Sequence, residues 1–147
     1  MLAFATWANA AGVEIRGIAQ IIDGDSIKIG RDEIRLFGVD APEWKQDCVR
    51  NGKLWKAGRD AASWLKRQIE GKEISCAPHD KDRYGRWIAT CINGAGDDIG
   101  RALVSNGWAY AYDRYSTRYI DDEKTAWENG TGVWTGECEL PWEWRLK

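Results

Sequence analysis

The stretch 21–43, IIDGDSIKIGRDEIRLFGVDAPE, combines an apolar strand pattern with acidic side chains and an arginine. The side chains that could do chemistry are those of Asp23, Asp25, Arg35, Asp40 and Glu43. Carboxylates placed close together repel one another and resist leaving water, so folded proteins gather them mainly around a cation. The stretch therefore predicts a divalent-metal site with a catalytic carboxylate and an arginine beside it.

Asp25 and Asp40 are the predicted metal ligands. They stand at the start of the second predicted strand and at the end of the third, and adjacent antiparallel strands can bring those ends to one rim. Two carboxylates with a backbone carbonyl and water form an oxygen-only ligand set, which suits Ca²⁺ or Mg²⁺. Asp23 is a third candidate, although Asp23-Gly24 also makes an ordinary turn. On spacing alone, a solvated acidic rim explains the same residues equally well.

Glu43 follows Asp40 by three positions, with Pro42 restricting the chain between them. A carboxylate there can reach a metal-associated water and orient or deprotonate it. An exposed loop glutamate is the alternative interpretation.

Arg35 interrupts the apolar pattern of the third strand, and Arg86 closes the turn DRYGR. A buried charge is costly unless it is paired, so Arg35 must face a carboxylate or an anionic ligand. Two guanidinium groups can hold a phosphate by bidentate hydrogen bonds and neutralise the charge that develops during its reaction. A structural salt bridge is the alternative for each arginine.

The elements that must position these residues follow from periodicity and turn signals. The predicted strands are 13–22, 26–29, 34–39, 73–76 and 87–92, with a helix over 54–69 between the third and the fourth. That helix has an apolar face of Leu54, Gly58, Ala61, Ala62, Leu65 and Ile69. This order is typical of an OB-type barrel, an α+β, mainly β fold.

Two more helices are predicted, one capped by Asp97 or Asp98 and ending before Gly107, the other over 116–129. Residues 44–52 are polar and predict a loop, whereas the aromatic tail 132–147 is expected to pack against the body. Residues 13–147 then form one domain, and residues 1–12 are interpreted as a signal-peptide remnant or a disordered N-terminus.

The net charge of −2 gives no general basic field, so a polyanionic substrate would need a local basic cluster. The single histidine, His79, predicts a surface role and argues against a structural zinc site and a Ser-His-Asp triad. The sequence holds no apolar run of membrane-spanning length.

Four cysteines, Cys48, Cys76, Cys91 and Cys138, allow three pairings as two disulfides. Antiparallel pairing of strands 73–76 and 87–92 would bring Cys76 near Cys91. Disulfides predict a secreted or periplasmic protein.

Four segments in order, IIDGDSIKI, IRLFGVDAPE, DKDRYGRWIA and IGRALVSNGWAYAY, resemble the staphylococcal nuclease (thermonuclease) family. The later positions Glu123, Ala126, Gly132 and Trp134 are similar too, so the likeness covers residues 13–144. It implies an OB-type barrel with three helices and Ca²⁺-dependent cleavage of DNA and RNA. Water would attack phosphorus, and the 5′-oxygen would leave to give 3′-phosphate ends.

The resemblance also assigns roles to individual positions. It implies that the metal ligands are Asp25, Asp40 and the backbone carbonyl of Ala41. It implies that the catalytic residues are Arg35, Glu43 and Arg86. It places Arg83 and Tyr84 near the terminal phosphate and Tyr115 in the nucleotide pocket. By analogy, the substrate is single-stranded DNA or RNA and the protein a monomer.

The sequence departs from the family pattern in several places. Ala41 and Ser26 stand where threonine is common, and the loop 44–56 is longer and carries Cys48. No cysteine occurs at 56–58, where related cysteine-rich members have one, which leaves Cys48 to pair with Cys138 or with nothing. Two other functions stay open: a catalytically silent OB-fold module that binds nucleic acid or protein, and an enzyme for a related phosphodiester or sugar phosphate.

Overall fold

The computed structural model describes residues 13–147, and five of its strands close into a barrel in the order β1-β2-β3-β8-β7. These strands are β1 (Ile15–Asp23), β2 (Ser26–Ile29), β3 (Asp32–Leu36), β7 (Glu73–Lys81) and β8 (Trp87–Ile92). The predicted α+β fold with a five-stranded OB-type barrel is therefore confirmed. The predicted signal-peptide remnant or disordered N-terminus, 1–12, lies outside the described residues.

The barrel closes because β3 pairs with two strands at once. It is antiparallel to β2 and parallel to β8, with Ile34 opposite Trp87. Inward side chains alternate along the strands, and Ile27, Ile34 and Leu36 are almost fully buried. This core fixes the register, because a slip of one residue would turn these apolar side chains outward and Arg35 inward.

The disulfide Cys76–Cys91 joins two residues that face each other directly in the antiparallel pair of β7 and β8. Their Cα atoms are 4.0 Å apart. Strand register therefore decides this pairing, as the sequence suggested.

The predicted loop 44–52 was wrong in part, because residues 48–55 form a hairpin of β5 (Cys48–Arg50) and β6 (Lys53–Trp55). Its two turn residues, Asn51 and Gly52, have φ of 54° and 73°, as a type I′ hairpin turn requires. Leu54 lies in this hairpin and is 77% exposed, so it does not belong to the helix. The helix α2 (Ala57–Ile69) starts three residues later than predicted and buries the rest of the predicted apolar face.

Two predicted helices are present, with one boundary moved. In α3 (Ile99–Ser105) the carboxylate of Asp98 caps the N-terminus by accepting from Arg101 N–H at 3.1 Å. The next helix, α4 (Ile120–Asn129), begins later than the predicted residue 116. The preceding turn is held by the buried Tyr119, whose hydroxyl donates to Asp98 at 2.8 Å.

The tail packs against the body, as predicted, and within residues 13–147 it adds a fourth α-helix to the three expected. After α4 come a 3-10 turn (Gly132–Thr135) and α5 (Pro141–Trp144). The second disulfide, Cys48–Cys138, ties this tail to the β5–β6 hairpin. Within residues 13–147, no helix is long and apolar enough to cross a membrane.

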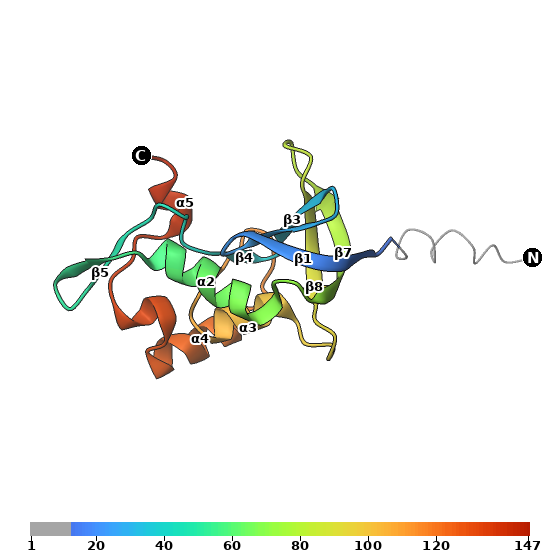
Figure 1. Ribbon diagram of the computed structural model, residues 1–147. Helices are drawn as coiled ribbons and strands as arrows, with labels where there is room; N and C mark the ends of the chain where they lie inside the picture. The colour runs from blue at the N-terminus through green and yellow to red at the C-terminus, as the bar shows by residue number, and fades with distance from the viewer. Residues whose placement is uncertain (1–12) are drawn as a thin grey trace, which may run out of the picture.

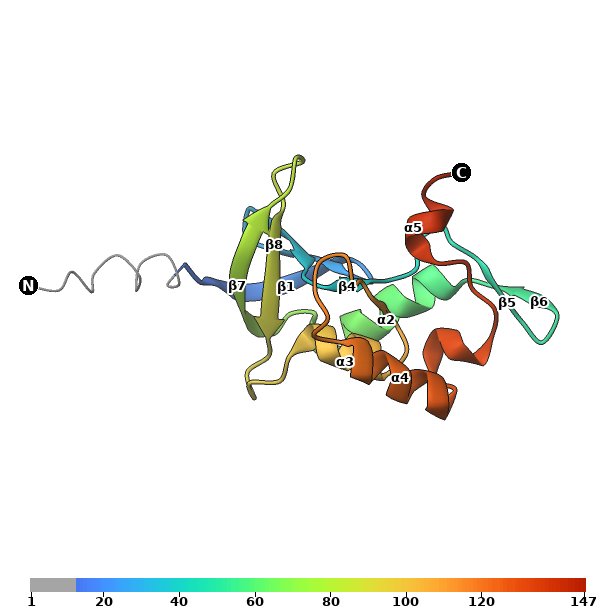
Figure 2. The ribbon, with the colours of Figure 1, turned by 180° about the vertical axis from the view of Figure 1, so that it is seen from behind.

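The helices α2, α3 and α4 gather on one side of the barrel (Figure 1). A two-stranded pair, β4 (Val39–Asp40) with β9 (Tyr110–Ala111), links the barrel to this helical side. The β5–β6 hairpin and α5 lie at the end away from β7 and β8, and α5 and the β7–β8 connector project on the same edge of the molecule (Figures 1 and 2).

Gly58 lets the first turn of α2 lie directly on the chain at Glu43. A Cβ atom on Gly58 would be 1.7 Å from the carbonyl oxygen of Glu43, closer than any real contact. The Gly58 N–H also donates to the carbonyl of Gln46 at 3.2 Å. The position of Glu43 therefore depends on the absence of a side chain on α2.

We expect Gly58→Ala to lower the free energy of unfolding by about 2 kcal/mol, because the added methyl meets backbone that cannot rotate away. Urea denaturation measures this change. Gly94→Ala is the matched control, since a Cβ there meets nothing within 4 Å. Equal stability of the two variants would contradict the proposed packing constraint.

Candidate active site

A cleft of about 510 Å³ opens between the β7–β8 connector and the end of α5. It is lined by Asp23, Asp25, Arg35, Glu43, Arg83, Tyr84, Arg86, Tyr112, Tyr115 and Arg145. Eight of these ten come from the sequence-based set, whereas Tyr112 and Arg145 do not. Asp40 and Ala41, also predicted, are buried at 0% and 2% exposure.

Asp25 and Asp40 are brought together because the Asp25 side chain binds the backbone next to Asp40. Asp25 precedes β2, and its Oδ2 accepts a hydrogen bond from the N–H of Ala41 at 2.8 Å. Asp40 lies in β4, where it pairs with Tyr110 of β9. The two predicted ligands and the Ala41 peptide are thus neighbours, although they are far apart in the sequence.

Arg35 satisfies the requirement that a buried charge be paired. Its side chain is 12% exposed, and Nη2 lies 3.5 Å from Oδ1 of Asp40. Its Nη1 donates to the carbonyl of Val39 at 3.2 Å. The guanidinium lines the cleft beside the ring of Tyr112, 6.0 Å from its centroid.

Arg86 is held by Asp82, a residue that the sequence-based set did not include. The Asp82 carboxylate accepts from Arg86 Nε at 2.7 Å and from the N–H groups of Arg86 and Tyr84, both at 2.9 Å. Burial opposes ionisation, but these hydrogen bonds outweigh it and lower the pKa of Asp82. The motif DRYGR carried a signal for this turn, since an Asp side chain can bond the backbone two residues ahead.

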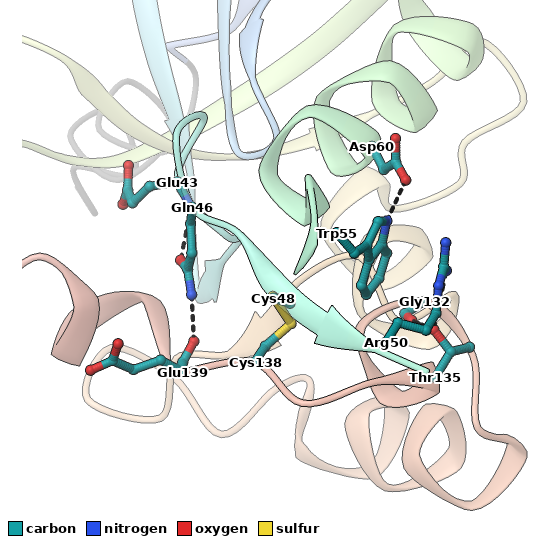
Figure 3. The surroundings of a disulfide bond; sticks show 10 residues. All are labelled: Glu43, Gln46, Cys48, Arg50, Trp55, Asp60, Gly132, Thr135, Cys138 and Glu139. Carbon is teal, nitrogen blue, oxygen red and sulfur yellow. Dashed lines mark hydrogen bonds between the residues drawn. A yellow bond between two sulfur atoms is a disulfide. The ribbon is translucent and has the colours of Figure 1, made fainter. Parts of the chain in front are cut away.

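Glu43 is positioned by the fully buried Gln46, which the sequence-based set also did not include. The Gln46 Oε1 accepts from Glu43 N–H at 3.2 Å, and its Nε2 donates to the carbonyl of Glu139 in the tail at 2.6 Å. Figure 3 shows this link beside the Cys48–Cys138 disulfide. A single glutamine in a polar stretch gives no sequence signal for such a role.

Arg145, at the end of α5, contacts the carboxylates of Asp40, a candidate metal ligand, and Glu43, a candidate catalytic residue. Its Nη1 and Nη2 donate to Oδ1 and Oδ2 of Asp40 at 2.9 and 2.7 Å, and Nη1 also donates to Oε1 of Glu43 at 2.6 Å. The hydrogen bonds to Asp40, above all, raise the pKa of Arg145, which stays fully charged. The one indirect signal for Arg145 in the sequence was the prediction that the aromatic tail packs against the body.

Two carboxylates at this site, Asp23 and Asp40, lie where burial disfavours their charged forms. Burial, followed by the negative charge of Asp25, raises the pKa of Asp23 to about 7. Burial likewise raises the pKa of Asp40, against the opposing hydrogen bonds from Arg145. Carboxylates in this state gain from any cation that joins them.

The donor set fits a hard divalent cation. No group of three or more His, Cys, Asp or Glu side chains arranged to hold a metal occurs among residues 13–147. The predicted ligands include only two such side chains, Asp25 and Asp40, together with the Ala41 carbonyl. Water would therefore supply the remaining ligands of a bound cation. The site accepts positive charge, because the Arg145 guanidinium already sits on Asp40.

Comparison with known proteins decides the family. The sequence profile of the family described as "Staphylococcal nuclease homologue" matches residues 33–136. The chain belongs to the staphylococcal nuclease family. The resemblance to this family is thereby confirmed, although the match begins after the first of the four segments (21–29) and does not test the roles of the individual residues.

Several curated relatives are similar over most of the chain. "Succinoglycan biosynthesis protein ExoI" of Rhizobium meliloti is 35% identical over 132 residues, which cover 88% of this chain and 69% of that protein. An "Uncharacterized endonuclease" of Escherichia coli O157:H7 is 28% identical, covering 87% and 82%. "Staphylococcal-like nuclease CAN1" of Arabidopsis thaliana is 32% identical, covering 76% and 32%.

We expect Asp82→Asn to lower the free energy of unfolding at pH 7 by about 1 kcal/mol, because it removes charge-assisted hydrogen bonds to the turn. The folded-state pKa of Asp82 is lowered, so its stabilisation is present above the unfolded pKa of about 3.9 and is lost as pH falls through the folded value. Denaturation at several pH values should show the difference from wild type shrinking below about pH 4.

Asp80→Asn is the matched control, because the Asp80 carboxylate accepts only from the adjacent Lys81 N–H among the described hydrogen bonds. An equal effect of the two substitutions, or a difference that persists at low pH, would contradict the role of Asp82.

Proposed function

We propose that the protein is a Ca²⁺-dependent nuclease that hydrolyses phosphodiester bonds of DNA, RNA or both. The observation that carries this proposal is one cleft that gathers Arg35, Glu43 and Arg86 next to the buried Asp25 and Asp40. Membership of the staphylococcal nuclease family and the endonuclease and nuclease names of several relatives support it.

In this proposal, Asp25, Asp40 and the Ala41 carbonyl hold the cation. When bound, Ca²⁺ supplies Lewis-acid polarisation of a phosphate oxygen and offsets negative charge. Asp23 lines the same cleft and is the weaker third candidate, because Asp23-Gly24 also begins the turn between β1 and β2.

Glu43 is the proposed base. Its carboxylate lines the cleft, 28% exposed, and can accept a proton from a water that attacks phosphorus. The proton goes to Glu43, and the new bond forms between the water oxygen and phosphorus. The bond from phosphorus to the 5′-oxygen breaks, and the leaving 5′-oxygen takes up a proton from solvent. The products are then a 3′-phosphate end and a 5′-hydroxyl end.

Arg35 and Arg86 are proposed to stabilise the charge on the reacting phosphate. Arg35 is rigid because its contacts to Asp40 and Val39 hold it, and Arg86 is rigid because Asp82 fixes its Nε. Guanidinium groups that are already oriented need no reorganisation as charge develops, which is the main source of such stabilisation.

The substrate-binding surface is proposed to favour single strands. Tyr84 and Tyr115 are 70% and 52% exposed at the rim of the cleft, and Arg83 lies beside Tyr84. Exposed aromatic rings stack unpaired bases whatever their sequence, while arginine meets the backbone. The local arginines supply the basic cluster that a net charge of −2 does not.

The two disulfides support a secreted or periplasmic location, because such bonds persist in oxidising compartments. We also propose a monomer, by analogy with the family. A catalytically silent OB-fold module is the less favoured alternative, since the complete catalytic set opens onto the same cleft.

Incubation of the purified protein with single-stranded DNA and RNA should give cleavage with Ca²⁺ and none with a chelator. End analysis should find 3′-phosphate and 5′-hydroxyl termini. Cleavage that survives chelation, or 5′-phosphate products, would contradict the mechanism. An absence of cleavage with any divalent metal would favour the binding module.

Glu43→Gln, Arg35→Ala and Arg86→Ala should each lower kcat about 100-fold or more, because each removes a transition-state contact. Initial-rate assays measure this, and circular dichroism checks the fold. Glu33→Gln and Arg16→Ala are matched controls on exposed strand positions. Near-normal turnover in any of the three variants would remove that residue from the mechanism.

A further inference from the structure

The C-terminal helix places a positive charge on the carboxylates assigned to the cation. The guanidinium of Arg145 is bidentate on Asp40, using both carboxylate oxygens, and it also donates to Glu43. One side chain thus contacts both a proposed metal ligand and the proposed base.

Arg145 is held there by an anchored segment. The Cys48–Cys138 disulfide fixes the start of the tail, and the Gln46 side chain donates to the Glu139 carbonyl (Figure 3). On α5 itself, the ring of Trp142 packs against Tyr112 with centroids 5.3 Å apart. Contacts before α5 and within α5 therefore hold the Arg145 guanidinium against Asp40.

A guanidinium that is hydrogen-bonded to both oxygens of Asp40 competes directly with a divalent cation for that carboxylate. Both need the lone pairs of the Asp40 carboxylate, and two positive charges a few Å apart repel strongly where burial limits screening. Asp40 is 0% exposed, so neither cation can be accommodated there by a shift of the carboxylate into water. The Nη2 of Arg35 also lies 3.5 Å from Oδ1 of Asp40.

We propose that Arg145 competes with the divalent cation for Asp40 and Glu43, so that cation binding releases the end of α5 from the active site. This inference rests on the cation site of the proposed function. It makes Arg145 an internal counter-ion that neutralises the buried carboxylate before the metal enters. Cation binding then also releases Glu43 from its ion pair with Arg145, so that its carboxylate can act as the base.

The competition has a reciprocal consequence. If the docked Arg145 lowers the affinity for the cation by a certain factor, then bound cation lowers the equilibrium constant for docking of the tail by the same factor. Two independent measurements, one of cation affinity and one of tail protection, therefore report on the same coupling.

Isothermal titration with Ca²⁺ is the first test. We expect Arg145→Gln to bind Ca²⁺ about ten-fold more tightly than wild type, within the usual range of coupling between sites. Arg145→Lys should fall between them, because an ammonium keeps the charge but cannot be bidentate on Asp40. Lys147→Gln is the matched control: it removes the same charge from the same segment, where Lys147 pairs with Glu139 instead.

Hydrogen exchange of the wild-type protein is the second test and needs no variant. The N–H groups of Trp144 and Arg145 bond to the carbonyls of Leu140 and Pro141, so they report on α5. We expect Ca²⁺ to accelerate their exchange several-fold while barrel amides stay protected.

The outcomes separate this inference from the proposed function. Ca²⁺ binding that is unchanged or weaker in Arg145→Gln, or tail amides that become more protected with Ca²⁺, would overturn the competition and leave the cation site standing. Failure of both wild type and Arg145→Gln to bind Ca²⁺ would overturn both. Binding by Arg145→Gln alone would support the competition strongly.

Discussion

The burial of negative charge at Asp25 and Asp40 is the constraint on which the site depends. The Asp40 carboxylate is 0% exposed, and burial raises its pKa, so the fold must bring cations to it. Arg35 reaches it from the barrel and Arg145 from the tail. The same unfavourable charge makes the position suitable for a divalent ion, because a cation there relieves repulsion as well as gaining ligands.

The rest of the molecule is a frame that holds this charge in place. The barrel fixes Arg35 on β3 opposite Ser26, the residue after Asp25, and the β4–β9 pair carries Asp40. Gly58 allows α2 to pack on the chain at Glu43, and Gln46 links that chain to the tail. A cleft of rigid arginines beside carboxylates suits phosphate chemistry, in which positioning and electrostatic stabilisation supply most of the catalysis.

The tail has a structural and a chemical part to play. It is tied to the β5–β6 hairpin by the Cys48–Cys138 disulfide, and it places Trp142 on Tyr112 and Arg145 on Asp40. In families built on one barrel, segments added outside the barrel can adjust a site without changing its central residues. The competition proposed for Arg145 is an adjustment of this kind, since it alters cation affinity and leaves the catalytic set intact.

The sequence by itself determined the barrel, because alternating apolar residues and tight turns state a strand period and leave few arrangements for five strands with one intervening helix. Eight of the ten side chains that line the cleft were predicted. The residue pattern alone left a solvated rim, a loop glutamate and structural salt bridges as alternatives, and the resemblance to the family favoured the active site. Tertiary structure alone decided Asp82, Gln46 and Arg145. Arg145 and Asp40 lie 105 positions apart, and the local periodicity of a sequence cannot predict a contact between residues so far apart.

The β5–β6 hairpin was missed although Asn51-Gly52 signals its turn, because the polar residues around that turn are typical of a loop. The hairpin is joined to the tail by the Val49–Glu137 bridge and the Cys48–Cys138 disulfide, and these contacts exist only in the folded chain.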